Sequence, residues 1–103
     1  MIEEMPEIKF DILKVELGKK HEETITFENT DDTPMIVHGQ SSDEKIFYYE
    51  PKNIVVPARS NIKAKIIYRP SSLEMEEGKI CFKTNKNSKW IYHLSGYGLL
   101  QAH

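Results

Sequence analysis

The residues of this chain best suited to chemistry are its single cysteine and its four histidines. A thiolate beside an imidazole base is a nucleophile, and Cys81 and His93 are two such residues that adjacent strands could bring face to face. A catalytic dyad also needs a third group that orients the base, and we find none in the sequence. We therefore interpret Cys81 and His93 as an incidental cross-strand pair, and an enzyme that uses them is a less favoured alternative.

Metal binding is the second chemistry to weigh. The lone cysteine and the scattered histidines lack the short ligand spacing of a zinc site. Asn29, Asp31, Asp32, Asp43 and Glu44 carry the oxygen ligands that calcium prefers, but their spacing is not that of an EF-hand. We interpret them as solvated acidic loops. The sequence thus predicts no catalytic residue, no metal, no cofactor and no small-molecule substrate.

The elements that must position all these residues are strands. Apolar and polar residues alternate with period two, and no window sustains the spacing of an amphipathic helix. Turn residues separate the apolar runs, and one slip between residues 12 and 15 indicates a bulge or a strand that switches sheets. Seven or eight short strands predict an all-β sandwich of two antiparallel sheets. The expected strands are 8–17, 24–29, 35–38, 46–49, 54–56, 62–68, 80–84 and 90–94.

The last two of these strands predict a hairpin whose register follows from parity. Their large apolar residues carry even numbers, so they share one face when the loop has an odd length. With a three-residue loop at 86–88 and Asn87 in the left-handed region, Cys81 lies opposite His93. The outer side of the hairpin and its surroundings then carry six residues: Lys79, Cys81, Lys83, Lys89, Ile91 and His93.

Length and composition predict a single domain over residues 1–103, with flexible tails at 1–6 and 99–103. Hydrophobic residues make up 39% of the chain, which is enough for a modest core. One cysteine precludes an internal disulfide, and the acidic start is unlike a secretory leader. From these two features we expect a cytoplasmic protein, and because no apolar run is long enough to span a bilayer, we expect no membrane insertion.

Charge is distributed unevenly along the chain. Residues 1–50 carry five Lys or Arg and 13 Asp or Glu, a net charge of −8, whereas residues 51–103 carry nine and three, a net charge of +6. We expect strands from the two halves to lie side by side and neutralise each other, with a basic surface patch as the minority alternative. Nucleic-acid binding is disfavoured because the overall charge is −2 and Trp90 and Tyr92 are expected in the core.

Three segments together resemble the ASH domain, a module of centrosomal and ciliary proteins such as Hydin that is related to the major sperm protein fold. The first is 10–18, similar to the opening strand of that family, and the second is 24–29, a strand that ends in Asn. The third is a series of landmarks in the family's order: Tyr49-Glu50-Pro51, Ile54-Val55-Val56-Pro57-Ala58, Ile66-Ile67-Tyr68-Arg69-Pro70 and Leu94-Ser95-Gly96-Tyr97-Gly98.

The resemblance implies an immunoglobulin-like, major sperm protein-like sandwich in a cytoskeletal protein of cilia, flagella, the axoneme or centrosomes, often in tandem copies. We therefore expect a non-catalytic module for protein binding or structure. Its partners would be axonemal, centrosomal or other cytoskeletal proteins, or neighbouring domains of the same chain. In such end-to-end packing, the acidic loop with Asp31 and Asp32 would lie near an interdomain surface.

The alternative is peptide capture, in which major sperm protein relatives bind short acidic motifs on a basic sheet face. Here Lys79, Lys83, Lys89 and His93 would supply the charge, and Cys81 and Ile91 would form an apolar floor. Solvated lysines that keep an edge hairpin soluble are the competing interpretation of the same residues.

Overall fold

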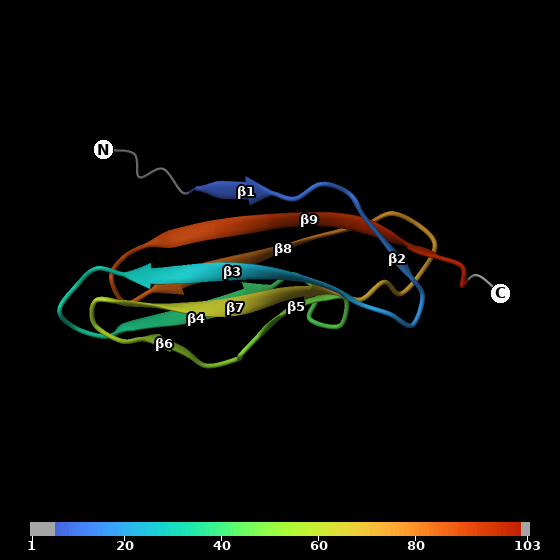
Figure 1. Ribbon diagram of the computed structural model, residues 1–103. Coiled ribbons are helices and arrows are strands. Elements are labelled where there is room, and N and C mark those ends of the chain that lie inside the picture. The colour runs from blue at the N-terminus through green and yellow to red at the C-terminus, as the bar shows by residue number, and fades with distance from the viewer. Residues whose placement is uncertain (1–5, 102–103) are drawn as a thin grey trace.

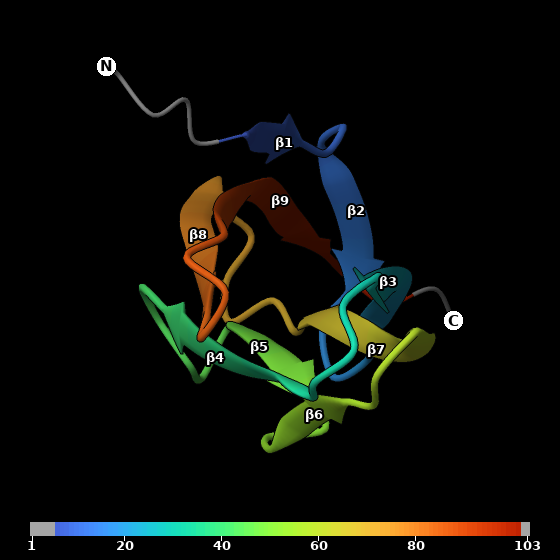
Figure 2. The same cartoon turned by 90° about the vertical axis from the view of Figure 1, so that its left-hand side faces the viewer.

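Two stacked sheets make up the computed structural model of the chain, which describes residues 6–101 (Figure 1). The larger sheet has the strand order β1-β9-β8-β4-β6, with β2 also paired to β9, and the smaller has the order β3-β7-β5. The end-on view in Figure 2 shows the strands enclosing a common interior. The strands are β1 (Glu7–Lys9), β2 (Leu13–Glu16), β3 (His21–Asn29), β4 (Met35–Ser41), β5 (Phe47–Glu50), β6 (Ile54–Val56), β7 (Ser60–Tyr68), β8 (Glu76–Thr84) and β9 (Lys89–Leu99).

This architecture confirms the predicted all-β sandwich. Residues 6–101 contain no helix that is long and apolar enough to cross a membrane. Of the predicted tails, residues 1–5 and 102–103 lie outside the described part of the chain. Pro6 accepts a hydrogen bond from the backbone N–H of Ile91, and Leu99 belongs to β9, so both ends of the described chain are tied to the larger sheet.

The predicted slip in the first strand is a bulge between β1 and β2. Both strands pair with β9 in parallel, with Lys9 beside His93 and Leu13 beside Gly96. From Lys9 to Leu13 the first segment advances by four residues, while β9 advances by three from His93 to Gly96. The extra residue turns Ile12 outward and Leu13 inward. The two halves stay in one sheet, so the alternative of a strand that switches sheets is wrong.

Aromatic side chains join the two sheets in the core. Phe82 of β8 is fully buried and contacts the rings of Phe27 from β3 and Tyr49 from β5 at centroid distances of 5.0 and 5.2 Å. Burial of such a ring contributes roughly 1.5–3 kcal/mol, and each aromatic pair adds about 0.5–1.5 kcal/mol. Gly39 makes room for this cluster, because a Cβ there would lie 2.6 Å from the Tyr49 ring.

The predicted hairpin has the expected parity but a different register. Its three-residue loop is 85–87, closed by a 3.0 Å hydrogen bond from the Thr84 N–H to the Ser88 carbonyl, and Asn87 has the predicted positive φ. Centring the loop one residue earlier moves the register by two residues. Cys81 therefore faces Ile91, and the predicted Cys81/His93 pair is wrong.

Five strands extend further than predicted: β3, β4, β7, β8 and β9. β4 continues to Ser41 through a stretch that we expected to be a polar break, and β8 begins at Glu76 inside an expected loop. β9 continues through Gly96 and Gly98, where we expected a tight exit from the strand. The missing side chain of Gly96 instead lets the Tyr68 ring and the Leu13 carbonyl approach β9, since a Cβ would lie 2.5 and 2.7 Å from them.

Asn29 is the buried polar residue that holds the end of β3 to its surroundings. Its side-chain amide donates hydrogen bonds to the carbonyls of Thr33, Val56 and Pro57 at 2.8, 3.1 and 3.2 Å, and its carbonyl accepts one from the Asp31 N–H. Asn fits this position because it both donates and accepts. The residue thereby links the β3–β4 loop to the end of β6.

Glu76 organises the opposite loop, between β7 and β8. Its carboxylate accepts hydrogen bonds from the buried Tyr68 hydroxyl at 3.1 Å and from the Ser71 N–H and hydroxyl at 3.0 and 2.5 Å. Burial raises the pKa of Tyr68 above its ordinary value of 10.0, and the bond to Glu76 raises it further. The neutral phenol is thus the form that the fold favours.

Replacing Asn29 should test how much this residue stabilises the fold. Asn29→Ala leaves three carbonyls without their donor, so we expect the free energy of unfolding to fall by about 2–3 kcal/mol in urea titrations. Asn29→Asp keeps the acceptor but not the donors and should also destabilise. The exposed Asn61→Ala is the control, with an expected change within about 0.5 kcal/mol. Equal stability of Asn29→Ala and Asn61→Ala would contradict the assignment.

Tyr68→Phe should give a pH-dependent difference in stability. At pH 7 we expect a loss of about 1–2 kcal/mol, because the hydrogen bond to Glu76 is removed. Above about pH 10 an unfolded tyrosine loses its proton while folded Tyr68 keeps it, so the wild type is destabilised as pH rises and the variant lacks this contribution. Urea unfolding should therefore show a smaller difference in the free energy of unfolding between wild type and Tyr68→Phe at pH 10.5 than at pH 7. A constant gap would argue against a raised pKa.

Candidate protein-binding face

The outer face of the six-stranded sheet brings the predicted basic residues together. Because alternate residues of a strand point to opposite sides, the core positions Ile80, Phe82 and Tyr92 leave the odd-numbered residues of β8 and β9 outward. We call this surface the basic face. It contains all six residues predicted from the hairpin: Lys79, Cys81, Lys83, Lys89, Ile91 and His93.

Two neighbouring strands contribute residues that the sequence analysis missed. β4 places His38 beside Lys83 and Gln40 beside Cys81, while β1 places Lys9 beside His93. β4 is separated from β8 by three other strands in sequence, so local alternation gave no signal for this pairing. The basic face is therefore four strands wide, where the hairpin alone predicted two.

Like charges stand opposite one another on this face. Lys83 lies directly across from Lys89, with His38 next in the same row, and such pairs are unfavourable in a sheet. The face also carries two carboxylates: Glu7 of β1 lies 3.0 Å from His93 through its Oε1 and the ring Nε2, and Glu77 is the outward residue of β8 next to Lys79. Lys83 and Lys89 thus bring two positive charges together at the solvent side of this row.

Cys81 and Ile91 form an apolar centre of the face. Ile91 is 9% exposed and lies on β9 between Cys81 of β8 and Glu7 of β1. Cys81 is half-buried beside it and faces away from the core. The register sets Cys81 beside Ile91 and Gln40 and sets His93 beside Lys79, so Cys81 and His93 are not the cross-strand pair that the sequence predicted.

A shallow hollow borders the basic face where β1 meets β2. Its volume is about 820 Å³, and its lining includes Ile12 and Met75, which are 54% and 49% exposed, together with Lys9 and His93. It is open to solvent and mixes apolar with charged side chains. The hollow extends the face toward the β7–β8 loop.

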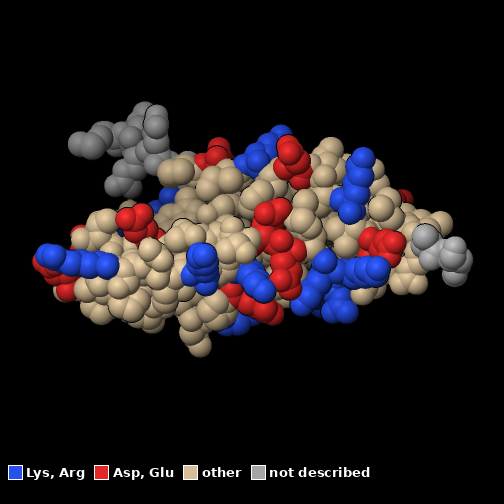
Figure 3. Space-filling model, in the orientation of Figure 1, with Lys and Arg blue, Asp and Glu red and all other residues tan. Residues whose placement is uncertain are grey.

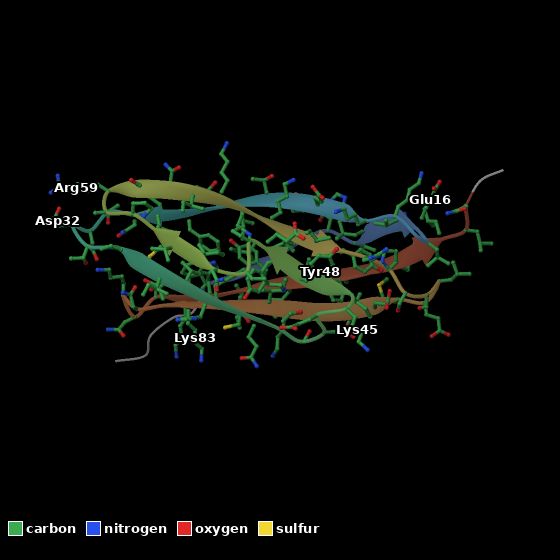
Figure 4. The ribbon with its side chains drawn as sticks, turned by 90° about the horizontal axis from the view of Figure 1, so that it is seen from below. Glu16, Asp32, Lys45, Tyr48, Arg59 and Lys83 are labelled. Carbon is green, nitrogen blue, oxygen red and sulfur yellow. The ribbon has the colours of Figure 1, made fainter. Side chains whose placement is uncertain are left out.

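The acidic loop lies at one end of the sandwich, apart from the centre of the basic face (Figure 4). Asp32 accepts a 2.6 Å hydrogen bond from Arg59 of the β6–β7 loop, and Asp31 lies 3.6 Å from the ammonium of Lys86 in the β8–β9 loop. These pairs join the acidic and basic halves of the chain, as does Glu22 with Lys65 at 3.0 Å. In residues 6–101 no three acidic, His or Cys side chains gather as a metal site would require.

Fold and surface together define an immunoglobulin-like β-sandwich module with an exposed basic sheet face. The sequence profile of one family, described as HYDIN/CFA65/VesB-like, Ig-like domain, matches residues 4–97. The chain belongs to this family. The resemblance found in the sequence is thus confirmed.

Solved structures of the same fold come from several sources. The ASH/PapD-like domain 7 of human CEP192 has a TM-score of 0.66 and 17% identity, over 96% of this chain and 84% of that one. WR4, a C. elegans MSP family member, has a TM-score of 0.57 and 13% identity over 91% and 93%. The Pseudomonas aeruginosa CupB2 chaperone has a TM-score of 0.59 and 14% identity over 84% and 52%. A comparison with curated protein sequences finds no significant match.

Lys83→Glu should stabilise the isolated domain. The change replaces a like-charge pair with an opposite-charge pair beside Lys89, and we expect a gain of about 0.2–1 kcal/mol at low salt that shrinks as salt is added. The double variant Lys83→Glu with Lys89→Glu restores a like-charge pair and should lose the gain. Thermal unfolding at two salt concentrations measures both. If the single variant is less stable than the double, the assigned register is wrong.

Proposed function

We propose that this domain is a non-catalytic protein-binding or structural module of a ciliary, flagellar or centrosomal cytoskeletal protein. The observation that carries the proposal is the basic face: Lys79, Lys83, Lys89 and His93 share one exposed sheet surface with a partly covered apolar centre. Family membership supports the cellular setting, because HYDIN and CEP192 give their names to relatives of the chain. One structural neighbour is the chaperone of a chaperone–tip adhesion subunit complex, which supports protein binding on this fold.

The charge pattern of the face favours an acidic partner. Unrelieved repulsion between Lys83 and Lys89 costs the free domain stability, and an acidic surface would turn that repulsion into attraction on binding. The central residues Cys81 and Ile91 add an apolar strip between the charged rows. Association should therefore be fast at low salt and weaken as ionic strength rises.

Capture of a short acidic peptide is the second candidate for the same face. It is favoured by an exposed apolar pair next to the basic row: Ile36 of β4 and Val55 of β6 are paired across strands and are 42% and 51% exposed. A peptide with an apolar anchor and adjacent acidic residues would cover both features. A flat protein surface would contact the face without such an anchor.

End-to-end packing through Asp31 and Asp32 has weaker support from the structure. Both carboxylates already have cationic neighbours within the domain, Lys86 and Arg59. A neighbouring domain would have to contact this loop without competing for those pairs. We retain end-to-end packing as an alternative, and the following experiment distinguishes it from binding through the basic face.

Proximity labelling from the full-length parent protein in ciliated cells, with purified-domain capture as a second readout, tests the proposal. Lys83→Glu with Lys89→Glu should reduce recovery of partners at least fivefold, because the face changes sign. Lys45→Glu with Lys63→Glu makes the same charge change elsewhere and serves as the control. Asp31→Ala with Asp32→Ala should have little effect. Loss of partners only in this last variant would favour end-to-end packing over the basic face.

A further inference from the structure

β3 is an open edge strand. It pairs with β7 along all nine residues, from His21 beside Tyr68 to Asn29 beside Ser60, and it ends the order of its sheet in residues 6–101. β2 crosses this side of the sandwich only where β3 begins (Figures 1 and 2). Natural edges are usually short, bulged or covered, so a long regular edge indicates a place where another strand can add.

The hydrogen-bond pattern of β7 identifies which backbone groups of β3 face outward. The N–H of Arg69 donates to the carbonyl of Ile46 on the β5 side, so odd-numbered residues of β7 bond toward β5 and even-numbered residues toward β3. Ile25 and Phe27, paired with even-numbered residues, therefore bond to β7. Thr24, Thr26 and Glu28 turn their backbone N–H and carbonyl groups to the open edge.

Apolar side chains border this edge on the interior side. Phe27 of β3 packs on Trp90 of β9 with 5.5 Å between ring centroids, and Trp90 is only partly buried. Phe10 is also partly buried, and Ile8 of β1 is 38% exposed. Figure 3 shows mostly uncharged surface between β9 and β3 at the end away from β2. An added strand would cover these side chains with its own inward-facing residues.

The acidic residues of β3 favour a basic partner strand over a second copy of this chain. The outer side of β3 carries Glu22 and Glu28, and β3 has no Lys or Arg. A second copy that pairs with β3 in antiparallel fashion about Ile25 would set Glu22 against Glu28 twice, which is unfavourable. Glu22 already forms ion pairs with Lys65 and Lys20 at 3.0 and 3.3 Å, which hold its pKa below its ordinary value of 4.5, whereas Glu28 has no ion pair with another of the described residues. A strand with basic residues six positions apart would instead oppose both carboxylates.

We propose that the open edge of β3 binds an extended segment of a partner protein, with Lys or Arg opposite Glu22 and Glu28 and apolar residues at the alternate positions between them. This site goes beyond the proposed function, which uses the outer face of the other sheet. Backbone hydrogen bonds to Thr24, Thr26 and Glu28 supply the attachment, and burial of Trp90 and Ile8 supplies apolar contact.

A fluorescein-labelled heptapeptide, lysine-valine-threonine-valine-threonine-valine-lysine, is the probe. Its lysines match the spacing of Glu22 and Glu28, and its valines share the face that meets the interior. We expect saturable binding by fluorescence polarisation and protection of the Thr24, Thr26 and Glu28 amides from hydrogen exchange when the peptide is present. In the free protein, the Thr26 amide should exchange much faster than those of Ile25 and Phe27, because its N–H has no partner strand.

Thr26→Pro removes an outward N–H without removing a ladder bond to β7, so it should weaken peptide binding about tenfold while Thr26→Val does not. Thermal unfolding checks that both variants fold. Lys83→Glu with Lys89→Glu should leave this binding intact, which separates it from the basic face. Three results would overturn the proposal: a protected Thr26 amide in the free protein, equal binding of a peptide with glutamates for lysines, or amide changes on β8 and β9. A dimer that Thr26→Pro dissociates would identify a second copy as the occupant and would also overturn it.

Discussion

The packing of Phe82 between the two sheets is the contact on which the rest of the structure depends. Its ring meets aromatic rings from β3, β5 and β9, so a single side chain fixes the larger sheet over the smaller. The contact requires Gly39, whose missing side chain leaves space for Tyr49 and Phe82. Once Phe82 faces inward, alternation obliges Cys81 and Lys83 to face outward. The composition of the basic face is therefore a consequence of the core.

The pairing of the first segment with β9 shapes both surfaces for which we propose a binding role. β1 and β2 both add to β9, so β9 has neighbours on both sides and the basic face gains Lys9 and Glu7. The same choice leaves β3 with one neighbouring strand within residues 6–101. The two surfaces that we propose for recognition thus arise from one arrangement: a sheet face that carries lysines, for an acidic partner, and an acidic strand edge, for a basic extended segment.

The hairpin of β8 and β9 shows how far sequence reasoning reaches. Even-numbered apolar residues predicted the buried face of both strands, because the alternation is local. The same parity predicted a loop of odd length, and the turn residues 86–88 predicted a left-handed Asn87, yet the loop centre lies one residue earlier. Several polar residues in a row allow more than one centre, and packing of Trp90 over Phe27 and Phe82 is compatible with the observed one. The prediction of which residues face outward is correct despite this change of register, whereas the predicted Cys81/His93 pair is wrong.

The sequence by itself determined the fold class, most strand positions, the outward set on the last hairpin and the family resemblance, since all of these depend on alternation and turn residues that are local in the chain. Only the tertiary structure decided that His38 lies beside Lys83, that Asn29 links the β3–β4 loop to β6, and that β3 is an open edge. These features depend on which distant strands become neighbours. That choice follows from how the side chains of the whole core fill space together, and no single segment of the sequence contains it.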